Sequence, residues 1–224
     1  MTELKAVVFD AYGTLLDFHA AMGRHAARLG PNWQQISADW RMKQTEYSWV
    51  RSLAGPAYHR DFWRLTEESL AWVAARHGID DLALLADILA AYKHLDAYPD
   101  ACAVLGQLRD QGLGTAILSN GEPSMLAAAV GSAGLTDLLD AVLSVEAAGV
   151  FKPDRRVYQL AEAHFGLSAA RMGFVSSNPW DAFGAHAFGF KVFWVNRSGQ
   201  QPEYDLGGKV SEVPNLSAVR AALG

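Results

Sequence analysis

A carboxylate placed directly after the first apolar run is the feature that most constrains this chain. The run Leu4–Phe9 is mostly apolar and partly β-branched, Asp10 follows it, and Gly13 can turn the chain three residues later. This pattern predicts a buried strand that ends at Asp10. A carboxylate at the end of a buried strand is a candidate covalent nucleophile, although its side chain can instead cap the following turn.

Further apolar runs follow the first, and helical patterns separate most of them. The later predicted strands are Gly114–Leu118, Ala141–Val145, Gly173–Val175 and Lys191–Val195. The helical patterns are Asp100–Gln111, Pro123–Ala133 and Arg155–Phe165. This alternation predicts an α/β fold, in which right-handed crossovers build a parallel sheet covered by helices on both faces. Ligand sites in such sheets lie beyond the carboxyl ends of the strands.

The segment of residues 17–98 breaks this alternation and contains no convincing strand. Apolar residues with helical spacing form pieces at Phe18–Leu29, Ser37–Leu53, Tyr58–His77 and Leu82–Tyr92. We therefore predict a core domain of residues 1–16 and 99–224, and a helical cap domain of residues 17–98 inserted after the first strand. Such a cap could close over the site and exclude water.

Composition and charge exclude several classes of protein. The net charge of -5 comes with no cluster of Lys and Arg, so we expect neither nucleic acid nor a membrane as partner. No apolar stretch reaches the roughly 18 residues of a membrane span. The N-terminus shows no signal-peptide features, so we expect a cytoplasmic protein. The single cysteine, Cys102, excludes an intramolecular disulfide, and its apolar helical setting predicts a buried, inert thiol.

Polar residues also follow the second and third predicted strands. Ser119-Asn120-Gly121 can form an anion-binding turn at a helix start, and a plain turn is the alternative. Lys152 lies on the loop after the third strand, from which it could reach back to Asp10, neutralise its charge and orient it. Lone lysines are usually solvated, so this role depends on the polar residues gathered around it.

The fourth predicted strand ends in a further polar cluster. Asp181 lies three residues beyond Asn178, so both side chains could converge on one point together with Ser176. The alternative is a capped helix, in which these residues favour the helix N-terminus. The sequence leaves the roles of two hydroxyl groups open. Thr14 could bond Asp10 or cap the chain, and Tyr158 could face either the site or the core.

Taken together, these segments resemble the four loops of the haloacid dehalogenase superfamily, and specifically those of the L-2-haloacid dehalogenases. The matching segments are Asp10–Thr14, Ser119–Gly121, Lys152-Pro153 and Ser176–Asp181, with Trp40–Trp49 as the arginine-bearing cap segment. The resemblance runs from the first strand to about Gly199 and implies a Rossmann-like sheet with a helical cap. It also implies a homodimeric enzyme that acts on a small 2-haloalkanoate and needs no cofactor and no metal.

The activity implied by the resemblance is hydrolytic dehalogenation of short-chain (S)-2-haloacids to (R)-2-hydroxy acids. Asp10 attacks the α-carbon with inversion and displaces halide, and water then attacks the carbonyl of the resulting aspartyl ester. Asp181, placed by Asn178 and Ser176, positions or deprotonates that water. The other catalytic residues that the resemblance implies are Thr14, Arg41, Lys152 and Tyr158.

The resemblance also implies how the substrate is held. Arg41 from the cap and Asn120 cradle the departing halide, with an aromatic edge from Phe174 or Trp180. A guanidinium suits this role because it stays charged and offers several fixed donors. The substrate carboxylate is implied to be held by Ser119 and by the backbone amides of Ala11 and Tyr12.

A phosphomonoesterase of the same superfamily is the main alternative. Those enzymes need an acid two residues after the nucleophile to protonate the leaving alcohol, and this chain has Tyr12 there. They also hold magnesium with carboxylates of the fourth loop, where Asp181 is the only carboxylate of this chain. A halide needs no proton to leave, so the sequence favours dehalogenation. Activity on fluoroacetate is a further alternative, and the sequence leaves the halogen and the chain length open.

Overall fold

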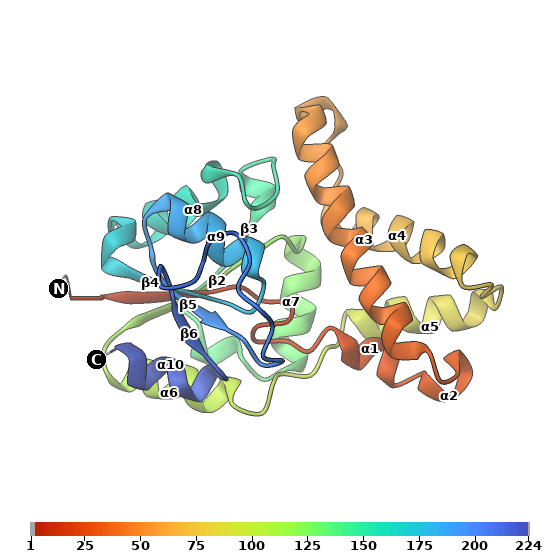
Figure 1. The fold of residues 1–224 in the computed structure, drawn as a ribbon, viewed down its shortest axis with the longest axis horizontal. Helices are drawn as coiled ribbons and strands as arrows, with labels where there is room; N and C mark the ends of the chain where they lie inside the picture. The colour runs from red at the N-terminus through yellow and green to blue at the C-terminus, as the bar shows by residue number, and fades with distance from the viewer. Residues whose placement is uncertain (1–2, 224) are drawn as a thin grey trace.

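A six-stranded parallel sheet forms the centre of the computed structural model, which describes residues 3–223. The strands follow the spatial order β3-β2-β1-β4-β5-β6 (Figure 1). Their bounds are β1 Ala6–Phe9, β2 Gly114–Ser119, β3 Ala141–Ser144, β4 Met172–Ser176, β5 Lys191–Val195 and β6 Ser211–Val213. The four residues of β1 are fully buried, because this central strand is covered on both faces. The predicted α/β fold is confirmed.

Helices cover both faces of the sheet. Helices α8 and α9 lie on one side, and α6 and α10 lie on the other (Figure 1). The core helices are α6 Ala101–Asp110, α7 Pro123–Ser132, α8 Arg155–Phe165, α9 Pro179–Phe188 and α10 Leu216–Leu223. Short 3-10 turns are η1 Pro56–Tyr58, η2 Thr136–Leu138, η3 Val145–Ala147 and η4 Ala169–Arg171. Within residues 3–223, every helix is too short or too polar to cross a membrane.

Five helices between β1 and β2 form a separate lobe beside the sheet, coloured orange to yellow in Figure 1. They are α1 His19–Gly23, α2 Ala26–Leu29, α3 Trp33–Ala54, α4 Phe62–Arg76 and α5 Leu82–Tyr92. This lobe is the predicted helical cap, although the domain boundaries at residues 17 and 98 remain a prediction. Helix α6 instead packs against β2 and α10, and so belongs with the sheet.

The long helix α3 carries a polar stripe into the interior of the cap. Gln44 is fully buried, and its Nε2 donates to Thr66 Oγ1 at 2.9 Å while its Oε1 accepts from Tyr92 OH at 3.3 Å. Trp40 Nε1 donates to the carbonyl of Thr66 at 3.0 Å. Because each buried polar group has a partner, this network specifies how α3 sits on α4 and α5.

Two details of the sequence-based prediction are wrong. Cys102 is exposed, because α6 turns its other face to the core, with Val104, Leu105 and Leu108 buried. Strand β6 was not predicted, because Ser211-Glu212-Val213 is too short and too polar to give an apolar run. It pairs with β5 and forms one edge of the sheet.

Candidate active site

The carboxyl ends of β1, β2 and β4 bring the predicted site residues together at one edge of the sheet. Phe9, the last residue of β1, is level with Ile117 on β2 and Val175 on β4. The residues that follow these strands therefore emerge side by side, as expected for neighbouring parallel strands. Asp10 continues the ladder by one bond, since its amide donates to the carbonyl of Val175 at 2.9 Å.

Lys152 links two buried carboxylates at this edge. Its Nζ lies 3.1 Å from Asp10 Oδ1 and 2.9 Å from Asp181 Oδ2. The side chains of Lys152 and Asp181 are fully buried, and that of Asp10 is 6% exposed. Buried charges are tolerated when they are paired and hydrogen-bonded, and here one ammonium serves two carboxylates.

The second oxygen of Asp10 is held by two further donors. Asn178 Nδ2 donates to Asp10 Oδ2 at 2.7 Å, and Thr14 Oγ1 donates to the same oxygen at 3.2 Å. Thr14 Oγ1 in turn accepts from the amide of Ser177 at 2.9 Å. Thr14 therefore bonds Asp10, which resolves the role that the sequence left open. The carboxylate is fixed in one orientation by contacts from three segments of the core.

Asp181 lies in the first turn of α9 and faces α8. Tyr158 OH donates to Asp181 Oδ1 at 2.8 Å, so Tyr158 faces the site. Burial raises the pKa of Asp181 above its ordinary value, and Lys152 partly offsets this rise. Burial beside Asp181 also raises the pKa of Tyr158 well above 10, which keeps its hydroxyl a proton donor. Gly184 permits this approach, because a Cβ there would collide with the Tyr158 hydroxyl.

The side chains of Asn178 and Ser176 bond groups other than the Asp181 carboxylate, whereas the carbonyl of Asn178 accepts from the amide of Asp181 at 3.1 Å. Asn178 occupies the N-cap position of α9, but its side chain turns to Asp10 and to the carbonyl of Tyr12. Ser176 Oγ accepts from the amide of Asn178 at 3.2 Å and so holds the loop. The reason is conformational, since Asn178 is still extended, with φ -90° and ψ 114°, whereas Asp181 is helical. Lys152 and Tyr158 hold Asp181 in their place.

The loop after β2 supports the lysine. Asn120 Oδ1 accepts from the amide of Lys152 at 3.0 Å, so the Nδ2 group of Asn120 is the one available to an anion. Ser119 Oγ accepts from the amide of Gly121 at 3.1 Å, and its own proton can be donated elsewhere. Ser119 is fully buried and Asn120 is 8% exposed. Both predicted residues thus lie at the same edge as Asp10.

Arg41 of helix α3 lies over the nucleophile loop from the cap side. Its guanidinium carbon is 6.0 Å from the ring centre of Tyr12 and 5.5 Å from that of Phe18. Within residues 3–223, Arg41 forms no ion pair, and its buried Nε has no hydrogen-bond partner. The Tyr12 ring stacks on Tyr92 of the cap at 5.5 Å with 5° between the planes. The cap therefore presents an uncompensated positive charge to this loop.

The two aromatic candidates occupy different places. Phe174 is fully buried on β4, where its ring centre lies 5.1 Å from Lys152 Nζ and 5.7 Å from the Tyr158 ring. Trp180 is half-buried and meets Trp49 of the cap edge-on, with ring centres 5.5 Å apart. Phe174 thus packs against the lysine inside the core, and Trp180 is the candidate that lies at the boundary with the cap.

Sequence reasoning missed two residues around the site. Arg197 donates from its Nη2 to the carbonyl of Thr14 at 2.9 Å, and it follows β5 at the same edge of the sheet. The polar pair Asn196-Arg197 after the fifth predicted strand was the signal that could have found it. Tyr92 gave no such signal, because an aromatic residue at helical spacing is typical of core packing.

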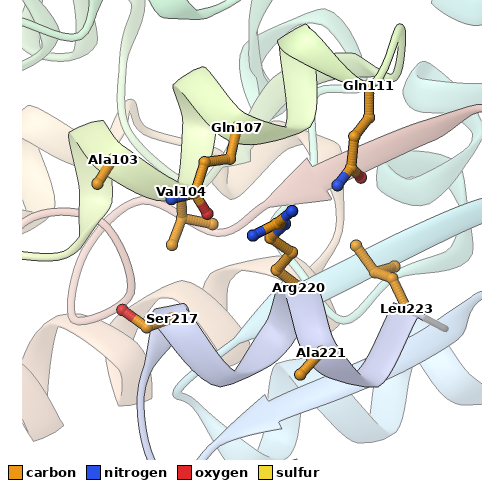
Figure 2. A pocket seen from close by; sticks show the side chains of 8 residues that line it. All are labelled: Ala103, Val104, Gln107, Gln111, Ser217, Arg220, Ala221 and Leu223. Atoms are coloured by element: carbon orange, nitrogen blue, oxygen red, sulfur yellow. The ribbon is translucent and has the colours of Figure 1, made fainter.

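Cavities lie both near this site and away from it. One of about 430 Å³ lies at the boundary of cap and core and is lined by Trp49, Ser52, Leu53, Phe151, Lys152, Pro153 and Asp154. Another, of about 680 Å³, lies between α6 and α10, and Arg220 is the only charged residue among the described residues that line it (Figure 2). None of the predicted site residues lines this second pocket. In the described part of the chain, His, Cys, Asp and Glu form no group of three or more suited to a metal ion.

Known proteins resemble this chain in both sequence and fold. A family model described as haloacid dehalogenase-like hydrolase matches residues 4–189. (S)-2-haloacid dehalogenase 4A from Burkholderia cepacia is 43% identical over 96% of this chain and 93% of its own length. (S)-2-haloacid dehalogenase 1 from Pseudomonas sp. (strain CBS-3) is 42% identical over 97% and 95%. The L-2-haloacid dehalogenase from Xanthobacter autotrophicus, solved with chloropropionic acid covalently bound, has a TM-score of 0.89, 39% identity and 99% coverage of each chain.

Proposed function

The chain belongs to the haloacid dehalogenase-like hydrolases, and within them to the (S)-2-haloacid dehalogenases, and we propose that it converts short-chain (S)-2-haloacids into (R)-2-hydroxy acids and halide. The observation that carries this proposal is the geometry around Asp10. Its carboxylate is held by Lys152, Asn178 and Thr14, and the cap sets the cationic Arg41 above its loop.

In the first step, an oxygen of Asp10 attacks C2 of the substrate from the side opposite the halogen. The new carbon–oxygen bond forms as the carbon–halogen bond breaks, and the halide leaves with the electron pair. The configuration at C2 inverts, and an aspartyl ester remains. Lys152 supports this step because its Nζ, 3.1 Å from Oδ1, holds the carboxylate in position for the attack.

The leaving halide needs positive charge and donors but no proton. Arg41 supplies a permanent charge that no described carboxylate neutralises, and Asn120 offers its Nδ2 group. The substrate carboxylate fits the Ser119 hydroxyl and the amides of Ala11 and Tyr12, which directly follow the nucleophile.

In the second step, water attacks the ester carbonyl of Asp10, so that the carbon–oxygen bond to the substrate remains in the product. Asp181 accepts one proton of this water as the oxygen adds to the carbonyl, and the bond between the carbonyl carbon and the substrate oxygen then breaks. The second proton of the water passes to the leaving oxygen, so that the hydroxy acid departs with the oxygen that Asp10 brought, Asp10 returns to its carboxylate, and Asp181 gives its proton to solvent. Lys152 and Tyr158 hold Asp181 at 2.9 and 2.8 Å and so keep its carboxylate aimed. The water's oxygen enters Asp10.

The position two residues after the nucleophile argues against phosphate ester hydrolysis. Tyr12 stands there, fully surrounded by protein, with its ring stacked on Tyr92. Burial raises the pKa of Tyr12 well above 10, which makes its hydroxyl a poor acid for a leaving alcohol. A halide leaving group does not require this proton.

Halide release tests the proposal directly. The purified chain, assayed without added metal, should release chloride from (S)-2-chloropropanoate and not from the (R) enantiomer. Fluoroacetate in the same assay establishes whether the carbon–fluorine bond is also cleaved. Release from neither chloropropanoate enantiomer, together with magnesium-dependent hydrolysis of p-nitrophenyl phosphate, would identify a phosphomonoesterase instead.

The assembly and the location of the protein are part of the same proposal. A homodimer, which the family resemblance implies, predicts about twice the mass of 24.3 kDa in light scattering. A mass of one chain at micromolar concentration would contradict it. The cytoplasmic location expected from the sequence is checked by cell fractionation.

A further inference from the structure

Arg197 joins the nucleophile loop to the segment that returns from the cap. It follows strand β5, and its Nη2 donates to the carbonyl of Thr14 at 2.9 Å. Its guanidinium carbon lies 4.0 Å from the ring centre of Tyr98. Cationic and planar, a guanidinium both stacks on aromatic rings and donates in a fixed direction. The Arg197 side chain thus contacts both segments that connect the core with the cap. We call these segments, residues 14–17 and 96–98, the cap hinge.

The two segments of the cap hinge are paired through their backbones. The amide of Asp17 donates to the carbonyl of Asp96 at 2.9 Å, and that of Tyr98 donates to the carbonyl of Leu15 at 2.9 Å. An antiparallel bridge between Leu16 and Ala97 lies between these bonds. The chain therefore leaves for the cap and returns from it as one ribbon, and Arg197 lies against the core end of that ribbon.

The contact of Arg197 with Asp100 is incomplete. Nη1 lies 3.7 Å from Asp100 Oδ2, an oxygen that already accepts from the amide of Leu216 at 2.8 Å. Arg197 Nε and Asp100 Oδ1 are both buried without a hydrogen-bond partner in the described chain. A buried polar group without a partner lowers the stability of the fold. Because the approach to Asp100 is long, the 2.9 Å bond to the carbonyl of Thr14 is the stronger of the two contacts of this guanidinium.

We propose that Arg197 is a positioning residue that fixes the nucleophile loop and the cap hinge relative to each other. Displacement of the Thr14 backbone would carry its hydroxyl away from Asp10 Oδ2 and from the amide of Ser177. Arg197 opposes this displacement by holding the Thr14 carbonyl, and it holds the returning segment through the ring of Tyr98. The inference rests on the proposed function for its kinetic consequences, but not for the contacts themselves.

Rapid mixing of (S)-2-chloropropanoate with excess enzyme tests the proposal. Arg197→Gln should slow ester formation roughly 10–100-fold, since misplacement by about 1 Å can cost 100-fold. The Thr14 hydroxyl acts on the attacking carboxylate, so the rate of ester hydrolysis should change less. Arg197→Lys keeps a charged donor and should recover most of the rate. Arg109→Gln, which removes an exposed ion pair with Asp140, is the matched control and should behave as wild type.

Hydrogen exchange provides a readout that does not depend on activity. In Arg197→Gln, amides of residues 12–17 and 95–100 should exchange faster, while those of β4 should not. Unchanged exchange rates in both segments of the cap hinge overturn the proposal. Faster exchange together with a wild-type rate of ester formation also overturns it, because the contact would then be purely structural. If Arg197→Gln does not fold, Tyr98→Leu removes the stacking partner and replaces it in both experiments. Wild-type enzyme that releases no halide would refute the proposed function and leave the exchange test standing.

Discussion

The two walls of the candidate site differ in how their charges are balanced. On the core wall, Asp10, Lys152 and Asp181 satisfy one another within 3.1 Å. On the cap wall, Arg41 lies on aromatic rings and has no described counter-charge. In the proposed mechanism, the core thus holds the nucleophile and the base in a prearranged geometry, whereas the cap supplies a cation that an anion arriving in the site can neutralise. Under that proposal, the bond-making groups follow the strands of the core, and the group that stabilises the leaving halide lies on a helix of the cap.

The largest expected effect is on the core wall. Asp10→Asn should abolish ester formation and lower turnover by roughly 10⁴-fold or more, because it removes the nucleophile around which the other residues act. Single turnover of the wild-type enzyme in ¹⁸O-labelled water should place the label in Asp10, detected by mass spectrometry of its peptide. Label found directly in the hydroxy acid, with Asp10 unlabelled, would contradict the covalent route.

A second core substitution separates the two chemical steps. Asp181→Asn should release one equivalent of halide and then stall, because the ester forms but its hydrolysis slows by about 10²- to 10⁴-fold. Intact-mass measurement should show the ester on the variant. If halide release is lost together with hydrolysis, Asp181 serves the first step and the division of roles assigned to the core wall is wrong.

The cap wall is tested by Arg41→Ala. This change removes the charge that stabilises the departing halide, and should slow ester formation roughly 10²- to 10³-fold, the usual cost of losing one such group. Arg51→Ala on the same helix is a matched control, since that arginine pairs with Glu68 in a half-buried ion pair. Near-normal turnover of Arg41→Ala on 2-chloropropanoate would remove the cap from the mechanism.

The pH dependence of ester hydrolysis reports on the core wall alone. Burial raises the pKa of Asp181 above the ordinary value of aspartate. Below this raised pKa the base becomes protonated, so the rate of ester hydrolysis should fall about tenfold for each pH unit. Ionised Asp181 therefore reduces stability at neutral pH, and this cost disappears as the pH falls below the pKa of the unfolded chain. A hydrolysis rate that stays flat down to the ordinary range would show that Asp181 is not the base.

The smallest effect is expected where the walls touch. Tyr12→Phe removes a buried hydroxyl that has no partner in the described chain, and should raise the free energy of unfolding by about 1 kcal/mol. The ring keeps its stacking on Tyr92, so turnover should stay within a few-fold of wild type. A loss of stability on urea unfolding would show that this hydroxyl has a partner after all.

Much of the site was predictable because strand ends can be read from a sequence. Each apolar run that stops at a polar residue marks a position, and parallel pairing gathers those positions at one edge. The sequence alone therefore predicts that Asp10, Asn120 and Asp181 lie together. The same rule applies to Arg197, which lies two residues beyond the end of the fifth strand.

Side-chain direction was not predictable in the same way. Asn178 and Asp181 are three residues apart, but one is extended and the other is helical, so they point to different partners. Cys102 shows the same limit on α6, where an apolar surrounding in sequence does not say which face is buried. Such outcomes depend on local dihedral angles and on packing between elements distant in the chain.

The edge contact between Trp49 and Trp180 has a practical consequence. One indole belongs to the cap and the other to the core, and their ring centres lie 5.5 Å apart at 83°. Two chromophores this close influence each other's near-ultraviolet circular dichroism and fluorescence, so separating them changes the spectrum. Any change in the distance between cap and core at this contact would therefore change the tryptophan signal, which a stopped-flow instrument can follow without an attached dye.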